Sequence, residues 1–346
     1  SGQQLYRKLQ VARAGASGEA GRVFDLDYKA AGSELFLVHR GPDGNVYGSS
    51  MLPLHLFRYE PVSRALTDMG KCSSAGGEAY SMANLDGRIY IASYPGAAVS
   101  IYDPSKPYKY GTTVSDNPRD IGRIDDISYR PRSALAGPLG RVWFASVPDY
   151  GVWGGPLSWY DPASDKKGSY KRIAGDASCY TLAWLEKRQL IAVGTTIQGG
   201  TGTQPKVKQA TLFLWDYRAE KKVWEGSPDR PVETFNALIA APDGKLYGTM
   251  TGGGAPGIFA FDPAKCAFTA HVPIQEETPL DNGLQIGPDG AIYGFTSNYI
   301  YRFRPPVLTP EIIVRDAGGF HVPGPIVGKE AFCARGHILR AATLFR

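Results

Sequence analysis

The chain of 346 residues lacks the features that mark several classes of protein. No apolar run approaches the roughly 20 residues that a membrane-spanning helix needs. No run of five like charges occurs and the formal net charge is +5, so we expect neither a membrane span nor a nucleic-acid partner. The four cysteines are widely spaced without a CxxC or CxxH pattern, which predicts buried free thiols rather than a zinc site or a disulfide framework.

Motifs of several enzyme mechanisms are missing as well. GxGxxG, P-loop, GxSxG and HExxH patterns do not occur, which argues against nucleotide-binding, α/β-hydrolase and zinc-peptidase chemistry. Helical periodicity is confined to a weak pattern over residues 1–14, which permits a helix there. The chain begins Ser1-Gly2, as a processed end does, so we expect a periplasmic or extracellular protein whose export signal was removed.

What the chain does have is a phrase that recurs about every fifty residues. Each copy runs from a Gly- or Asp-rich turn into a short apolar strand, small residues, a second strand and an aromatic-Asp-Pro ending. A period of this size with strand-like content indicates a solenoid, a propeller or a similar array. The copies begin at residues 41–48 (GPDGNVYG), 85–90 (LDGRIY), 137–143 (GPLGRVW), 242–248 (PDGKLYG) and 287–294 (GPDGAIYG).

Aligning the copies predicts an all-β fold, a seven-bladed β-propeller in one domain over residues 1–346. Residues 1–21 are expected as an N-terminal extension. We expect residues 22–30 to complete the last blade and close the ring, so that deletion of the residues before Ala30 unfolds the protein. The predicted blades are residues 33–72, 76–124, 127–174, 178–227, 232–276, 281–316 and 320–346 together with 22–30.

The same alignment predicts where ligand-binding residues lie. In a propeller, loops from all blades converge on one face around a central channel. The starts of the inner strands supply Phe36, Ala79, Arg132, Tyr180, Asn236, Asn282 and His321, flanked by Glu78, Tyr80, Asp126, Arg130, Thr234 and Asp281. The second set of loops supplies Ser49, Ser50, His55, Tyr94, Asp149, Tyr150, Trp153, Gln198, Lys206, Lys208, Asn298, Arg335 and His337.

Two of these loops are long, and long loops in compact domains are usually functional or disordered. Residues 147–156 carry Tyr150 and Trp153 on a glycine-rich frame, and residues 195–209 are rich in Gly and Thr with Lys206 and Lys208. Exposed aromatic rings beside basic and amide side chains are typical of a sugar-binding cleft. The simpler alternative is that Tyr150 and Trp153 only pack their loop against the protein.

Arg130 and Arg132 are two residues apart on one predicted strand, so we expect them on the same side, where they could hold a carboxylate. With His321 and one of Tyr80, Tyr150 or Tyr180 as base and acid, these residues would suffice for β-elimination. Trp153, Asn236, Asn282, Glu78, Tyr94, Lys206, Lys208 and Arg335 are the predicted substrate contacts. The alternative is that both arginines form structural ion pairs with Asp125, Asp126 or Glu78.

Two further kinds of site remain open. The blade model brings His55, His321 and His337 to one face, where they could bind a divalent cation such as Mn, Ca or Zn; His39 and His271 are interpreted as structural. Glycoside hydrolysis needs a pair of carboxylates, for which the face offers Glu78, Asp126, Asp149 and Asp281. The other Asp residues in the Asp-Gly and Asp-Pro phrases are interpreted as turn formers.

The phrases Pro-Asp-Gly-Lys-Leu-Tyr-Gly (242–248) and Phe-Asp-Pro-Ala-Lys (261–265) resemble those of bacterial seven-bladed propellers, including propeller polysaccharide lyases of the oligogalacturonate and ulvan lyase types. The resemblance covers residues 33–346 and is one of fold. It implies an acidic oligo- or polysaccharide as partner, His and Tyr catalysis and often a divalent metal. We therefore expect a monomeric lyase that cleaves a uronate-containing glycan; the alternatives are a non-catalytic propeller that binds glycan or protein, and a glycoside hydrolase.

Overall fold

The computed structural model describes residues 8–11, 22–25, 33–274, 277–315 and 319–344. The chain divides into two compact units, residues 1–32 and residues 33–346. In the first unit, strand β1 (Lys8–Val11) pairs antiparallel with β2 (Arg22–Asp25). Among the described residues, no helix is both long enough and apolar enough to cross a membrane.

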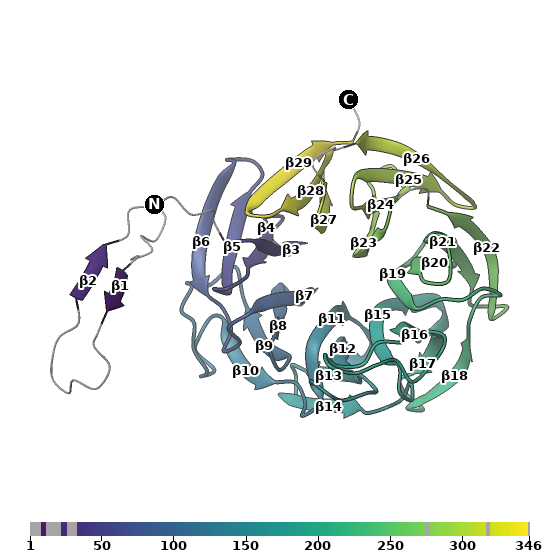
Figure 1. Ribbon diagram of the computed structural model, residues 1–346, viewed down its shortest axis with the longest axis horizontal. Coiled ribbons are helices and arrows are strands. Elements are labelled where there is room, and N and C mark those ends of the chain that lie inside the picture. The colour runs from purple at the N-terminus through teal and green to yellow at the C-terminus, as the bar shows by residue number, and fades with distance from the viewer. Residues whose placement is uncertain (1–7, 12–21, 26–32, 275–276, 316–318, 345–346) are drawn as a thin grey trace. The chain divides into compact units, whose positions relative to one another are not determined.

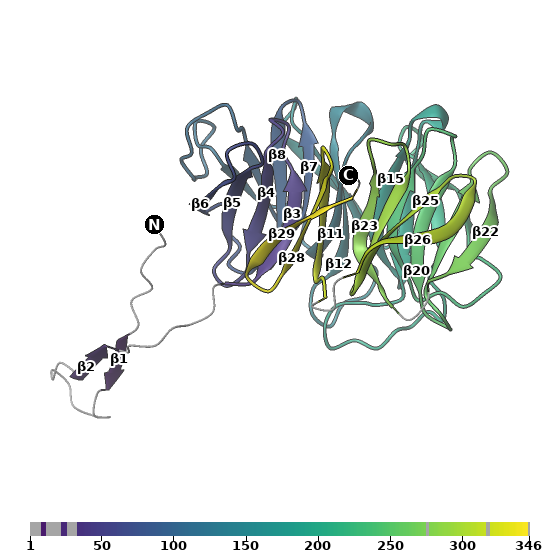
Figure 2. The same ribbon diagram turned by 90° about the horizontal axis from the view of Figure 1, so that it is seen from above.

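The second unit consists of antiparallel sheets in which consecutive strands pair with one another. Four sheets have four strands each, and the last sheet has three, β27-β28-β29. An eight-stranded sheet consists of two such meanders joined by one bridge, between Thr196 and Thr234. In Figure 1 these sheets stand around a central opening, and Figure 2 shows their strands running between the two faces.

The strands fall into sets by their position in the meanders. The first strands are β3 (Leu35–Arg40), β7 (Glu78–Leu85), β11 (Ser128–Ala136), β15 (Ser178–Leu185), β19 (Thr234–Ala240), β23 (Pro279–Ile286) and β27 (Val322–Val327). The second strands are β4 (Val46–Ser50), β8 (Arg88–Tyr94), β12 (Val142–Pro148), β16 (Leu190–Thr196), β20 (Leu246–Thr251), β24 (Ile292–Thr296) and β28 (Glu330–Arg335).

The third strands are β5 (His55–Glu60), β9 (Ala98–Tyr102), β13 (Leu157–Asp161), β17 (Leu212–Asp216), β21 (Gly257–Asp262), β25 (Tyr299–Arg304) and β29 (Ile338–Thr343). The fourth strands are β6 (Ala65–Lys71), β10 (Arg119–Arg123), β14 (Lys166–Tyr170), β18 (Lys221–Gly226), β22 (Ala267–Pro273) and β26 (Val307–Arg315). Two short 3-10 helices occupy Pro138–Gly140 and Glu186–Arg188.

The hydrophobic core lies between neighbouring sheets. Trp143 of β12 packs in one cluster with Phe213 and Trp215 of β17, and each of these side chains is almost fully buried. The first strands pack against one another in chain order, and β27 packs against β3. The arrangement is an all-β, propeller-like fold, as the repeat predicts.

The recurring Pro-Asp-Gly phrase closes each first turn with a side-chain hydrogen bond. Tyr47 donates to Asp43 at 2.8 Å, and Tyr247 donates to Asp243 at 2.7 Å. The tyrosine rings are fully buried, so the aspartates satisfy hydroxyls that would otherwise be unpaired in the core. The glycine of the phrase adopts a positive φ, 84° at Gly44, which L side chains rarely adopt. These aspartates are turn formers, as predicted.

The described N-terminal residues bear on two expectations from the sequence. Lys8–Val11 is a strand, where the weak periodicity permitted a helix. The described part of segment 22–30, Arg22–Asp25, pairs with β1, and the last sheet has three strands among the described residues, so the completion of that sheet by residues 22–30 stays a prediction. The apolar alternation of residues 22–28 indicated a strand, but a strand pattern does not specify its partner. Residues 26–30 lie outside the described part of the chain.

Candidate functional site

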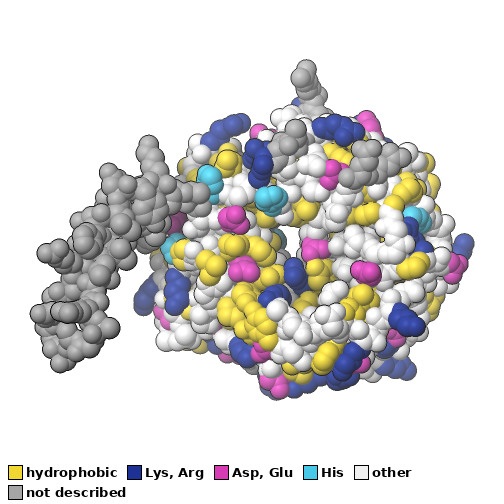
Figure 3. Space-filling view, in the orientation of Figure 1, with side chains coloured by type: hydrophobic (Ala, Val, Ile, Leu, Met, Phe, Trp, Pro, Cys, Tyr) yellow, Lys and Arg dark blue, Asp and Glu magenta, His cyan; other side chains and the backbone are white. Residues whose placement is uncertain are grey.

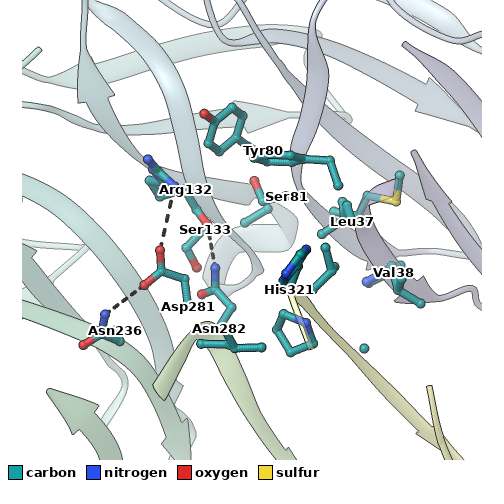
Figure 4. A pocket seen from close by; sticks show the side chains of 18 of the residues that line it. Leu37, Val38, Tyr80, Ser81, Arg132, Ser133, Asn236, Asp281, Asn282 and His321 are labelled. Atoms are coloured by element: carbon teal, nitrogen blue, oxygen red, sulfur yellow. Dashed lines mark hydrogen bonds and ion pairs between the residues drawn. The ribbon is translucent and has the colours of Figure 1, made fainter. Parts of the chain in front are cut away.

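A cavity of about 790 Å³ lies at the centre of the second unit and is lined by residues from all the first strands. Its size is in the range of ligand-binding pockets. Figure 3 shows the opening, with charged side chains of both signs and histidines on the surrounding face. Figure 4 shows the groups that point into it from different strands, among them Tyr80, Arg132, Asn236, Asp281 and His321.

The first strands aim side chains into the cavity through β-bulges. In each of five first strands, the pairing with the second strand shifts by one residue near the same depth. A bulge leaves one residue unpaired, bends the strand and redirects a side chain. The residues passed over are Phe36, Tyr80, Arg132, Tyr180 and Asn236, and all of them line the cavity.

The bulges agree with the sequence alignment except in β7. There Tyr80, rather than the predicted Ala79, is the residue passed over, and Ala79 is fully buried. Asn282 and His321, from β23 and the residue before β27, also line the cavity as the alignment places them.

Arg132 is the cation of the cavity, and Asp281 is its carboxylate partner. The guanidinium lies 4.7 Å from the centre of the Tyr80 ring and 5.4 Å from that of Tyr180, and its Nη1 is 3.7 Å from Oδ2 of Asp281. Tyr180 donates its hydroxyl proton to Asp281 at 2.5 Å, and the Asn236 amide donates to the other carboxylate oxygen at 2.9 Å. Side chains of four strands therefore meet at the Asp281 carboxylate. Arg132 pairs with Asp281 and not with Asp125 or Asp126.

Two polar atoms of this network have no partner. Nε of Arg132 and Oδ1 of Asn236 are buried and make no hydrogen bond within the described part of the chain. Buried polar atoms are almost always hydrogen-bonded in proteins, so such atoms mark positions where a ligand or water binds. One is a donor and the other an acceptor, and both residues line the cavity. A ligand or water at these positions would have to supply an acceptor for Arg132 Nε and a donor for Asn236 Oδ1.

The pKa values of Tyr80, Tyr180 and Glu78 are raised, which favours their protonated forms. Burial, followed by the Asp281 charge, raises the pKa of Tyr180, and burial raises the pKa of Tyr80 although Arg132 lowers it. Burial also raises the pKa of Glu78, against the opposing effects of Tyr80, Arg130 and Arg132. Tyr80 and Tyr180 are thus proton donors rather than bases at neutral pH.

His321 is an imidazole without a competing partner. Its ring forms no hydrogen bond or ion pair with the described residues, while its backbone N–H donates to Ala334. The predicted metal triad is not formed: no group of three or more His, Cys, Asp or Glu that could hold a metal occurs among the described residues. His55 instead pairs with Asp68 at 3.1 Å, and the exposed His337 does not line the cavity. The blade alignment placed the three rings on one face but could not specify their separation.

Arg130 contacts a different set of groups from Arg132. Its guanidinium lies over the rings of Tyr94, Tyr129 and Tyr150, at 4.8, 5.8 and 5.2 Å from their centres. The two arginines thus have different ring neighbours, although both act electrostatically on Glu78 and Tyr80; β11 shifts register between Ser128 and Arg130 and again between Pro131 and Ser133. Tyr129 was not predicted; strict alternation along the strand would have directed its side chain away from Arg130.

The two long loops pack against each other. Gly151 donates its N–H to the Thr201 carbonyl at 3.0 Å, and Gly200 donates to the Val152 carbonyl at 2.8 Å. Trp153 donates its indole N–H to the Gln204 carbonyl at 2.8 Å, and the Lys206 ammonium lies 3.6 Å from the centre of the Trp153 ring. Trp153 and Lys206 thus join the loops, in line with the simpler interpretation of Trp153.

The remaining predicted contacts lie away from the cavity or bond internally. Asn282 donates its amide to the Arg132 carbonyl at 2.7 Å. Asp126 pairs with Lys171 at 2.6 Å, which removes one carboxylate from the hydrolase set. Lys208 and Arg335 are exposed and do not line the cavity. The four cysteines form no disulfide within the described part of the chain, and Cys72, Cys179 and Cys333 are buried, as predicted.

The chain matches no protein-family model and no curated protein in sequence. Its fold is similar to that of three solved structures. A hydrazine synthase chain of Kuenenia stuttgartiensis has a TM-score of 0.70 at 11% identity, over 93% of this chain and 99% of that one. A catalytically inactive virginiamycin B lyase from Staphylococcus aureus with quinupristin has a TM-score of 0.64 at 10% identity, over 87% and 92%.

The extracellular domain of a B. thetaiotaomicron protein described as a hybrid two-component system has a TM-score of 0.61 at 12% identity. The match spans 97% of this chain but only 39% of that one. At these identities the likeness is one of fold, a propeller-like all-β architecture, and function has to be argued from the site.

Proposed function

We propose that residues 33–346 form a seven-bladed β-propeller whose ring closes by packing of β27 on β3, and that its cavity is the active site of a lyase acting on a uronate-containing glycan. The observation that carries the proposal is the composition of the cavity. It combines a guanidinium, an imidazole without a described partner and two phenols held in the protonated form. These are the three kinds of group that β-elimination next to a carboxylate requires.

In the proposed reaction, Arg132 binds the carboxylate of the sugar and stabilises the charge that develops when the adjacent C–H proton is removed. His321 accepts that proton. The electron pair forms a double bond to the neighbouring carbon, the glycosidic C–O bond at that carbon breaks, and the leaving oxygen takes a proton from Tyr80. Tyr180 is less suited to this role because its proton is already donated to Asp281.

Asp281 competes with a substrate for Arg132, but only in part. The Nη1–Oδ2 distance of 3.7 Å is longer than a charge-assisted hydrogen bond, and Nε has no partner in the described structure. A guanidinium has five N–H donors in one plane, so a carboxylate can bind the Nη donors that Asp281 does not use. Asp281 is thus a positioning residue for Arg132.

Non-catalytic binding of an acidic glycan is the second candidate, and the network around Asp281 favours it. The charges of Arg132 and Asp281 compensate each other, and the raised pKa values of Tyr80 and Tyr180 keep both phenols neutral. A glycoside hydrolase is supported less well, because Asp281 is the one member of the predicted carboxylate set that lines the cavity. The neighbour named a lyase supports the fold only.

The test is a panel of acidic and neutral polysaccharides in which ultraviolet absorbance of unsaturated uronate and reducing ends are followed together. A rise in both supports the lyase, and reducing ends alone would indicate a hydrolase. His321→Ala and Arg132→Gln are expected to abolish turnover while His337→Ala, a matched exposed histidine outside the cavity, leaves it unchanged. Binding without either product, in a folded protein, would select the non-catalytic alternative.

A further inference from the structure

Arg130 is held in a cage of three tyrosines, Tyr94, Tyr129 and Tyr150, which we call the tyrosine cage. Its guanidinium lies 4.8 to 5.8 Å from the three ring centres. The rings support one another: Tyr94 and Tyr129 meet edge to face at 5.3 Å, as do Tyr129 and Tyr150 at 5.2 Å. The hydroxyls of Tyr94 and Tyr150 are hydrogen-bonded at 2.7 Å. A cation enclosed in this way keeps one orientation.

The tyrosine cage lies beside the central cavity and not in it. Arg132, Tyr80 and Tyr180 line the cavity, whereas Arg130 and the cage rings do not. Tyr80 connects the two groups, because its ring is 6.0 Å from that of Tyr94 and beneath the Arg132 guanidinium. Figure 3 shows the corresponding surface, on which basic and hydrophobic side chains (tyrosine included) adjoin the opening near β7 and β11.

The positive charge of Arg130 is poorly compensated. Within the described residues, no carboxylate forms an ion pair with it; its side chain donates from Nη2 to the Tyr150 hydroxyl at 3.3 Å and also interacts with Tyr80. Arg130 and Arg132 lower the pKa of the Glu78 carboxyl, but burial raises that pKa by more, so the carboxyl is shifted toward its neutral form. A guanidinium has five N–H donors, and the hydrogen bonds to Tyr150 and Tyr80 do not use all of them, so donors remain for an anion.

We infer that Arg130 and the tyrosine cage form a second acidic subsite, so that the ligand carries two acidic groups on neighbouring sugars. The inference rests on the proposed function, in which Arg132 binds the first carboxylate. The two guanidiniums have different ring neighbours, Tyr94, Tyr129 and Tyr150 for Arg130 and Tyr80 and Tyr180 for Arg132, which gives each its own place for an anion. The exposed face of Tyr150, which is 47% accessible, provides a stacking surface for the second sugar ring.

The experiment is isothermal titration calorimetry of the full chain at low salt with galacturonate, digalacturonate and trigalacturonate. We expect an affinity gain of at least about tenfold from the monomer to the dimer, because the second contact becomes intramolecular. Arg130→Gln should remove this gain and leave monomer affinity within about twofold, whereas Arg132→Gln should weaken the monomer itself. Arg218→Gln is the matched control, since Arg218 lies 4.7 Å from the Tyr217 ring in the turn that follows β17.

Retention of the full dimer gain in Arg130→Gln would overturn the inference, as would an equal loss for monomer and dimer. If Arg130→Gln does not fold, Tyr150→Phe replaces it, because that change removes the hydroxyl bond to Arg130 at an exposed loop position and should reduce the same gain. A dimer gain without unsaturated product means that the lyase proposal fails and the subsite stands. Unsaturated product without any dependence on Arg130 means the reverse.

Discussion

Gly200 is a point of close backbone approach between the two long loops. A Cβ built on it would lie 1.7 Å from the Asp149 carbonyl oxygen and 2.9 Å from that of Pro148. Both neighbours are backbone atoms, so no side chain can move away to make room. Gly200→Ala therefore displaces the loop that carries Tyr150 to the tyrosine cage.

The size of the displacement follows from the contact. Real Cβ atoms essentially never approach closer than 3.0 Å, so the backbone must separate by about 1.3 Å. Overpacking of this kind costs about 1–3 kcal/mol, and loss of the bond from Gly200 N to the Val152 carbonyl adds about 0.5–1.5 kcal/mol. A shift of this size also exceeds the tolerance of a hydrogen bond such as that between Tyr150 and Arg130.

The assay combines urea unfolding with titration of mono- and digalacturonate. We expect Gly200→Ala to lose about 1–3 kcal/mol of stability and the affinity gain of the dimer, with monomer affinity unchanged because Arg132 contacts neither loop. Gly76→Ala is the control, since nothing lies within 4 Å of its added Cβ. The reasoning is refuted if both variants behave alike.

Three further outcomes are expected. Asp281→Asn should lose about 1–3 kcal/mol of stability in urea unfolding, because the charged acceptor of Tyr180 is lost. The same variant should bind monogalacturonate more tightly, because Arg132 loses its ion pair. Unchanged affinity would contradict the pairing of Arg132 with Asp281. Deletion of residues 1–32 should leave the melting temperature nearly unchanged, since the described sheets of residues 33–346 contain no strand from them. Unfolding of the truncated chain would instead support a closing role for residues 22–30. Burial lowers the pKa of His39, so the unfolded chain takes up the proton first and the free energy of unfolding should fall as the pH drops below about 6.5. His39→Gln should flatten this pH dependence. Parallel pH profiles of the two proteins would exclude a contribution of His39.

The sequence determined the strands and their turns. The recurring phrases lie where turns lead into observed strands, for example residues 242–248 at the start of β20 (Leu246–Thr251). The signals are local: Asp-Gly and Asp-Pro turns set the chain reversals, and apolar alternation sets the strand between them. The repeat also predicted which residues line the channel, because equivalent positions in equivalent strands lie at the same depth. Arg132, Tyr180 and Asn236 follow from that alignment alone.

The tertiary structure alone decided which side chains meet. Asp281 becomes the partner of Arg132 through packing of strands that are some 150 residues apart in sequence, and no local pattern encodes that pairing. The bulges that redirect Tyr80, and the register shifts that separate Arg130 from Arg132, depend on the neighbouring strands. The pairing of Arg22–Asp25 with β1 is likewise not specified by the strand pattern itself. Backbone preferences select a strand, but contacts between distant segments select its register and the environment of each charge.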